Sequence, residues 1–136
     1  MTLKLKVRSL SSEKTRSISD EKFYTICSIN IRRKITQVHI EEMDNIQDFY
    51  SIWRIWPRMK YLQLNCLNNM NIPLFLRTIL KDINDSGNSY LRSLCLQLAA
   101  VDDQMTNNLK QMIECDKLLL QFTIKRIMDN VYLQWT

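Results

Sequence analysis

The stretch Met59-Lys60-Tyr61-Leu62-Gln63-Leu64 has apolar side chains at its first, fourth and sixth positions. Leu62 and Leu64 alternate with polar residues, which is typical of a strand with one buried face. The same spacing of apolar residues recurs in copies that begin at residues 35, 91 and 119, so the four copies start 24, 32 and 28 residues apart along the chain. A partial copy near the N-terminus includes Leu5 and Val7. We therefore predict strands at residues 2–8, 35–41, 59–65, 91–97 and 119–127. The residues of the frame that we expect to be buried are Val38, Ile40, Leu62, Leu64, Leu94, Leu96 and Ile124.

Helices are expected between these strands, because apolar residues there recur at spacings of three and four. Asp44 followed by Gln47 fits a capping box, and Asn71 and Asp102 are suited to cap two later helices. A final strand is expected to return as a hairpin across residues 128–130. The predicted helices cover residues 19–31, 44–56, 71–83 and 102–113.

Strands that alternate with helices predict a parallel sheet with crossover helices. A sheet with helices on both faces would have strands that are continuously apolar, whereas polar residues such as Gln37, Gln63 and Ser93 interrupt these. We therefore expect a single α/β domain over residues 1–136, namely a short leucine-rich-repeat-like solenoid. Its mostly parallel sheet would have helices on one face and a C-terminal hairpin cap.

The repeated frame resembles the strand segment of a leucine-rich repeat of the ribonuclease-inhibitor type. The segments MKYLQLNCL at 59–67, PLFLRTIL at 73–80 and YLRSLCLQL at 90–98 resemble the C-terminal region of F-box/leucine-rich-repeat proteins. In that family an F-box binds an adaptor, and the repeats hold a substrate for a cullin-type ubiquitin ligase. Residues 1–34 lack the Leu-Pro start of an F-box, so the resemblance implies the C-terminal part of a longer protein or a member without an F-box.

The polar strand positions form the predicted binding surface. In such a fold, His39, Gln63, Cys95 and Thr123 would lie side by side across the sheet, at the strand spacing of about 4.8 Å. Tyr61 is the expected anchor, because aromatic residues dominate binding hot spots. The alternative is that these residues are ordinary solvated strand positions. The predicted partner-binding residues are His39, Glu41, Tyr61, Gln63, Asn65, Ser93, Cys95 and Gln97.

We expect no catalytic, metal or cofactor site. His39 is the only histidine, and the sequence contains no recognisable nucleophile–base motif. The cysteines at 27, 66, 95 and 115 are far apart, without a Cys-x-x-Cys pair for zinc. Free buried thiols are typical of reducing compartments, so we expect a cytoplasmic or nuclear protein.

Basic residues outnumber acidic residues in the N-terminal quarter of the chain. Residues 1–34 contain nine Lys and Arg against three Asp and Glu, whereas residues 35–136 contain ten against eleven. The alternative function is therefore a small basic nucleic-acid-associated protein that uses residues 1–34. No aromatic stacking platform accompanies the basic residues, so a protein partner is preferred. No apolar run reaches the length of a membrane span, and we expect a monomer.

Overall fold

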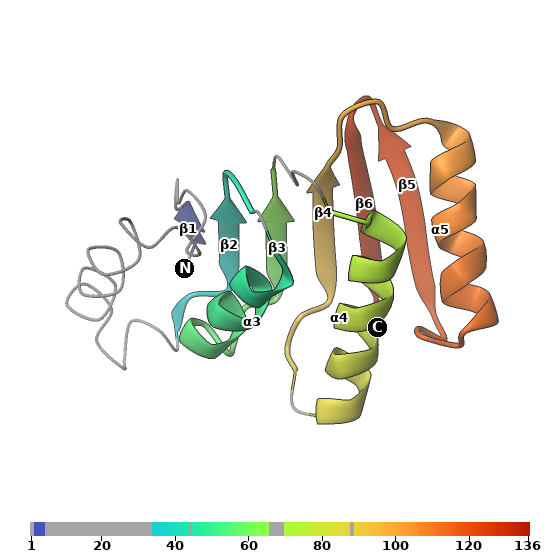
Figure 1. Cartoon of the computed structure of the whole chain (residues 1–136). Helices are drawn as coiled ribbons and strands as arrows, with labels where there is room; N and C mark the ends of the chain where they lie inside the picture. Colours follow the sequence, from blue (N-terminus) through green and yellow to red (C-terminus); the bar gives the residue numbers. More distant parts are fainter. Residues whose placement is uncertain (1, 5–33, 44, 66–69, 88) are drawn as a thin grey trace.

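The computed structural model describes residues 2–4, 34–43, 45–65, 70–87 and 89–136. It shows one sheet with helices packed against it (Figure 1). In chain order the elements are β1 (Thr2–Lys4), β2 (Gln37–Ile40), α3 (Ile46–Ile55), β3 (Tyr61–Leu64), α4 (Ile72–Ser86), β4 (Ser93–Gln97), α5 (Asp103–Cys115), β5 (Phe122–Ile127) and β6 (Asn130–Trp135).

The sheet is open and mixed, with its six strands in the order β1-β2-β3-β4-β6-β5. The first four strands of this order are parallel neighbours. Leu62 of β3 lies opposite Val38 of β2 and opposite Leu94 of β4. Equivalent positions of the first three copies of the frame are therefore aligned across the sheet.

The predicted leucine-rich-repeat solenoid is wrong, because the chain forms a small α/β domain around this mixed sheet. In a solenoid the fourth copy would pair in parallel with β4. Instead β6 lies between them, antiparallel to β4 on one side and to β5 on the other. A hairpin does form at Met128 and Asp129, but its second strand occupies the inner place. The inner strand buries Val131, Leu133 and Trp135, whereas none of the six residues of β5 is fully buried.

Helix α3 begins one residue later than the sequence predicted. The cap is the side chain of Asn45, which accepts hydrogen bonds from the backbone N–H groups of Gln47 and Asp48, whereas the predicted cap, Asp44, lies outside the described residues. Such a cap satisfies amide groups that have no partner within the helix. The difference follows from chemistry, because neighbouring Asp and Asn residues are almost equally good caps.

The caps of α4 and α5 are confirmed. Asn71 accepts from the backbone N–H of Leu74, at 3.1 Å, and Asp102 accepts from that of Met105, at 2.8 Å. Gly87 ends α4 with a φ of 66°, a left-handed conformation that only glycine adopts without steric cost. These caps fix where the two helices meet the sheet.

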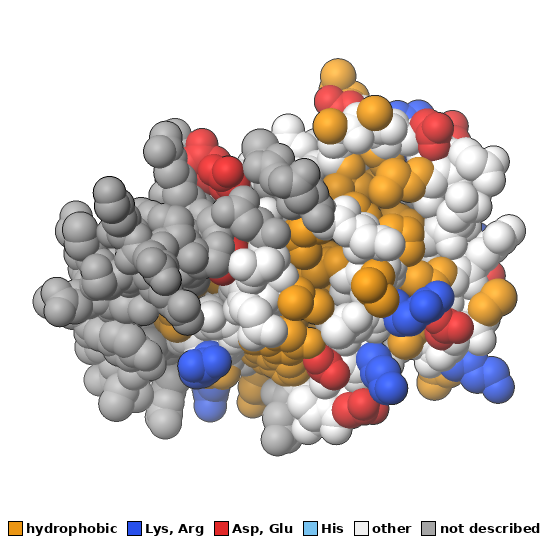
Figure 2. Space-filling model, viewed as in Figure 1, with side chains coloured by type: hydrophobic (Ala, Val, Ile, Leu, Met, Phe, Trp, Pro, Cys, Tyr) orange, Lys and Arg blue, Asp and Glu red, His pale blue; other side chains and the backbone are white. Residues whose placement is uncertain are grey.

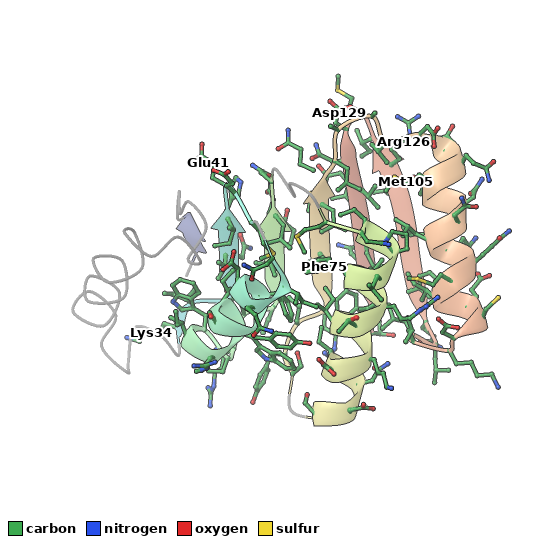
Figure 3. All side chains as sticks on the ribbon, viewed as in Figure 1. Lys34, Glu41, Phe75, Met105, Arg126 and Asp129 are labelled. Atoms are coloured by element: carbon green, nitrogen blue, oxygen red, sulfur yellow. The ribbon has the colours of Figure 1, made fainter. Side chains whose placement is uncertain are left out.

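The core lies between the helices and one face of the sheet. Phe75 of α4 and Met105 of α5 lie on the sheet side of their helices (Figure 3). Ile124 of β5, which was predicted to be buried, is only partly buried because β5 is an edge strand. The other predicted core residues are confirmed as buried: Val38, Ile40, Leu62, Leu64, Leu94 and Leu96.

Several predictions concern residues outside the described part of the chain. They are the helix at 19–31, most of the strand at 2–8, and nearly all of the basic segment 1–34. Among the described helices, none combines the length and the apolar character that a membrane span requires.

Candidate protein-binding face

The described helices lie on one side of the sheet (Figure 1), and we call the opposite side the open face. Side chains alternate along each strand, so Leu62 points to the helices while Tyr61 and Gln63 point to the open face. The register of the strands arranges the open face in two rows. The first row is His39, Gln63, Cys95, Tyr132 and Lys125, and the second is Gln37, Tyr61, Ser93, Gln134 and Thr123.

The structure brings most of the predicted binding residues together on this face. His39, Gln63 and Cys95 belong to the first row, and Tyr61 and Ser93 to the second. The remaining three lie at or beyond the carboxyl ends of the parallel strands, where Glu41 is exposed at the upper edge of the sheet (Figure 3). These three residues are Glu41, Asn65 and Gln97.

A chain of side-chain hydrogen bonds crosses β2 and β3 on the open face. The Tyr61 hydroxyl donates to Gln63 Oε1 at 3.2 Å, and Gln63 Nε2 donates to Asn65 Oδ1 at 3.2 Å. Asn65 Nδ2 lies 2.8 Å from His39 Nε2, which accepts when the ring proton is on Nδ1. Each of these four side chains is hydrogen-bonded to at least one of the others, so the bonds fix their positions relative to one another.

Cys95 is the exception among the predicted residues, because it is only 1% exposed. Its thiol interacts with the hydroxyl groups of Tyr61 and Tyr132, whose strands flank β4 on either side. Burial raises the pKa of the Cys95 thiol, although the two tyrosine hydrogen bonds partly oppose the increase. A protonated, covered thiol is a poor nucleophile, so Cys95 supports the face from below and is not itself a contact residue.

The same cluster perturbs both tyrosines. Burial, with a further contribution from Cys95, raises the pKa of Tyr61 to about 12. The pKa of Tyr132 is also raised, chiefly by Cys95 and then by burial. Both hydroxyls are therefore neutral over the physiological pH range and act as hydrogen-bonding groups on the open face.

The predicted row of His39, Gln63, Cys95 and Thr123 is wrong in its last member. Tyr132 of β6 lies beside Cys95, and Thr123 lies opposite Gln134 in the other row. The sequence prediction missed Tyr132 because it placed β5 next to β4. The alternation of apolar and polar residues in 131–135 would have assigned Tyr132 to the open face had β6 been placed there.

A groove of about 1100 Å³ runs along the amino-terminal ends of β3, β4 and β5 and reaches the second half of α5. Tyr61 and Thr123 line it from the open face, and Phe122 and Trp135 contribute apolar surface. The basic residues that line it are Lys60, Arg92, Lys110 and Lys117, together with one acidic residue, Glu114. The groove is thus continuous with the second row of the open face.

Within the described ranges, no three His, Cys, Asp or Glu side chains are close enough together to hold a metal ion. Of the two described cysteines, Cys95 is buried and Cys115 is exposed at the end of α5, and neither forms a disulfide. Hydrogen bonding and aromatic contact are the interactions that this face can provide.

The chain matches no known family model, and no curated protein or solved structure shows significant similarity to it.

Proposed function

We propose that this chain is a protein-binding module without catalytic activity, and that the open face is its recognition surface. The observation that carries the proposal is the bonded chain of Tyr61, Gln63, Asn65 and His39. Side chains that are already fixed lose little conformational entropy when a partner binds. A face held in this way is suited to recognition by shape and hydrogen bonding.

The composition of the open face supports a protein partner. The central parts of protein interfaces are poor in charged residues and rich in tyrosine. Of the ten residues in the two rows, Lys125 is the only one with a formal charge, and Tyr61 and Tyr132 are both present. We therefore expect a partner surface that is mainly neutral and offers both hydrogen-bond donors and acceptors.

Two further features favour binding over catalysis. The buried, protonated Cys95 provides no nucleophile, and His39 is hydrogen-bonded to an amide, not to a potential nucleophile. The ubiquitin-ligase role stays a prediction of the family resemblance. The proposed binding face does not depend on that role.

Photo-crosslinking tests the proposal. A photoreactive phenylalanine analogue in place of Tyr132 keeps an aromatic ring in the first row of the open face and leaves the bonded chain intact. The same group at Gln111, exposed on α5, provides the control. We expect a protein adduct from position 132 that is absent from position 111. Adducts of equal yield at both positions, or none at position 132, would contradict a dedicated open-face interface.

The nucleic-acid alternative predicts a different outcome of the same experiment. An adduct that is sensitive to nuclease, and whose formation falls steeply with salt, would favour nucleic acid, because such binding releases counterions in proportion to the phosphates contacted. A nuclease-resistant adduct with a shallow salt dependence would support the protein interface.

Tyr61→Ala should weaken binding of the crosslinked partner by about 2 kcal/mol, roughly 30-fold in Kd. The substitution removes the half-buried aromatic ring that lies between Gln37 and Ser93 in the second row. Tyr90→Ala is the matched control, because Tyr90 is 48% exposed and lies outside the open face. Isothermal titration with the isolated partner measures both. Equal affinities for the two variants would contradict a hot-spot role for Tyr61.

A further inference from the structure

The outer edge of β5 has no strand partner among the described residues. β5 is the last strand in the sheet order, and its ladder pairs only with β6. Four of its six residues are exposed, and α5 packs beside the strand, where Arg126 of β5 forms a salt bridge with Asp103 of α5 at 2.9 Å. An edge of this kind presents a row of backbone N–H and C=O groups that can pair with an extended chain.

The basic groove defined above begins at this edge. Phe122 and Thr123 at the start of β5 line it, and Lys110 and Lys117 face it from α5 and the turn that follows. Its volume of about 1100 Å³ exceeds what a few ordered water molecules occupy. A chain that pairs with the start of β5 would therefore lie in the groove, beside the second half of α5.

The charge of the groove determines the chemistry of its occupant. Its four basic side chains are exposed, and none forms a salt bridge with a described residue. Figure 2 views the helix side, where the visible Lys and Arg side chains lie mostly in the lower half and are spread across its width. Opposite charges across an interface steer partners together, so the groove favours carboxylates.

The groove also has an apolar component. Leu120 is 92% exposed and lies beside Phe122 in its lining. Along a β-strand, successive side chains point to opposite sides. A segment that alternates acidic and apolar residues could therefore place carboxylates near the lysines and apolar side chains on Leu120 and Phe122.

We infer that the groove and the free edge of β5 accept an extended acidic segment of the protein partner, which adds to the sheet as a strand. This inference rests on the proposed function. A nucleic acid fits less well, because a phosphate backbone has no donors for the strand's carbonyl groups. Trp135 is only 7% exposed and is packed in the core, so it is not available for base stacking.

The test uses the full chain and a short fluorescein-labelled peptide of alternating glutamate and valine residues, with binding followed by fluorescence anisotropy. We expect saturable binding that weakens about tenfold in the K110E/K117E variant. Lys81→Glu on α4 is a charge control, since Lys81 is exposed and lies outside the groove. Unchanged circular dichroism would show that both variants are folded.

Backbone pairing is tested separately from charge. The same peptide with alternate amides N-methylated keeps its carboxylates but cannot pair along one edge, so we expect its binding to be lost. Equal binding of the methylated peptide would overturn strand addition, and equal binding to the wild-type and K110E/K117E chains would overturn the assigned groove. Displacement of the peptide by oligothymidine at lower concentration than by the unlabelled peptide would overturn the preference for protein.

The two proposals can fail independently. His39→Ala alters the open face without altering the groove lining or the bond that holds Tyr61, so it should leave peptide affinity unchanged. If position 132 crosslinks to a protein while the acidic peptide does not bind, the proposed function stands and the inference about the groove is wrong. If the peptide binds while position 132 gives no adduct, the open-face interface is wrong.

Discussion

The parallel strands β2 to β4 and the outer hairpin strand β5 belong to one sheet, but they bury their side chains differently. In each parallel strand the residues that point toward the helices are fully buried. β5 has the same apolar frame, with Phe122 and Ile124 in corresponding places, yet neither is fully buried. The frame is shared, and the packing is not.

This difference shows what a repeated apolar pattern determines. The pattern determines which side of a strand faces the core, because side-chain direction is a property of the strand alone. It does not determine which strand lies alongside, because that depends on the loop and on competition between distant segments for the inner position. β6 occupies the inner position, and β5 is left with one neighbour.

The largest expected effect tests this comparison directly. Leu62→Ala should lower the free energy of unfolding by about 2–5 kcal/mol, because Leu62 is fully buried between two parallel neighbours. Ile124→Ala should cost less than about 2 kcal/mol, because a partly buried edge residue leaves little cavity. Urea denaturation of both variants measures the two values.

Leu133→Ala is the control that separates the effect of an inner place in the sheet from the effect of belonging to the hairpin. Leu133 belongs to the hairpin but is only 2% exposed and lies opposite Leu94. Leu133→Ala should therefore lower the free energy of unfolding by as much as Leu62→Ala does. If Leu133→Ala were as mild as Ile124→Ala, inner placement of β6 would not explain the difference between the two regions.

Much of the fold was predictable from sequence, since local chemistry determines it. The strand frames, the caps Asn71 and Asp102, and the buried face of the parallel strands follow from alternation and capping preference. The neighbour of β4 was not predictable in this way. It depends on whether the strand at 122–127 or the strand at 130–135 buries more apolar surface there, which is a non-local property.

The candidate site was predictable to the same extent. His39, Tyr61 and Gln63 were assigned to one face because their register is local to the parallel copies. Tyr132 was missed, and Cys95 was expected to be exposed although Tyr61 and Tyr132 cover it. Both errors have the same cause, which is that the strand beside β4 was assigned incorrectly.

The alkaline titration of Tyr50 on α3 and Tyr61 on β3 tests whether burial shields their hydroxyl groups. Burial and a hydrogen bond to Asp82 raise the pKa of Tyr50 to about 12, and burial with Cys95 raises that of Tyr61 to about 12, from an ordinary value of 10.0. A folded-state pKa above the unfolded value contributes stability that is complete below pH 10 and is lost as the pH rises through about 12. Stability should therefore fall across this window.

Ultraviolet difference titration would show whether Tyr50 and Tyr61, together with Tyr132, ionise above the ordinary tyrosine pKa of 10.0. Tyr61→Phe and Tyr50→Phe should each make the alkaline loss of stability less steep, because the ionising hydroxyl is absent. Tyr90→Phe, at an exposed position, is the control. Ionisation of every tyrosine near pH 10 in the folded protein would show that neither hydroxyl is shielded.

The smallest expected effect concerns the hairpin turn. Met128 is 79% exposed and has a φ of 55°, a left-handed conformation that costs a non-glycine residue about 1–2 kcal/mol. Glycine adopts this conformation without that cost but loses more entropy on folding, about 0.5–1 kcal/mol. Met128→Gly should therefore stabilise the protein by about 0.5–1 kcal/mol, measured by urea denaturation.

Asp129→Gly is the matched substitution at the other turn residue, whose φ is not positive. It should be slightly destabilising, because it gains no relief of strain and pays the entropy of glycine. If both substitutions destabilised the protein equally, the left-handed conformation of Met128 would not reduce the stability of the hairpin. If only Met128→Gly stabilises, the hairpin that places β6 beside β4 forms against a local backbone cost. The burial of Val131, Leu133 and Trp135 would then be what offsets that cost.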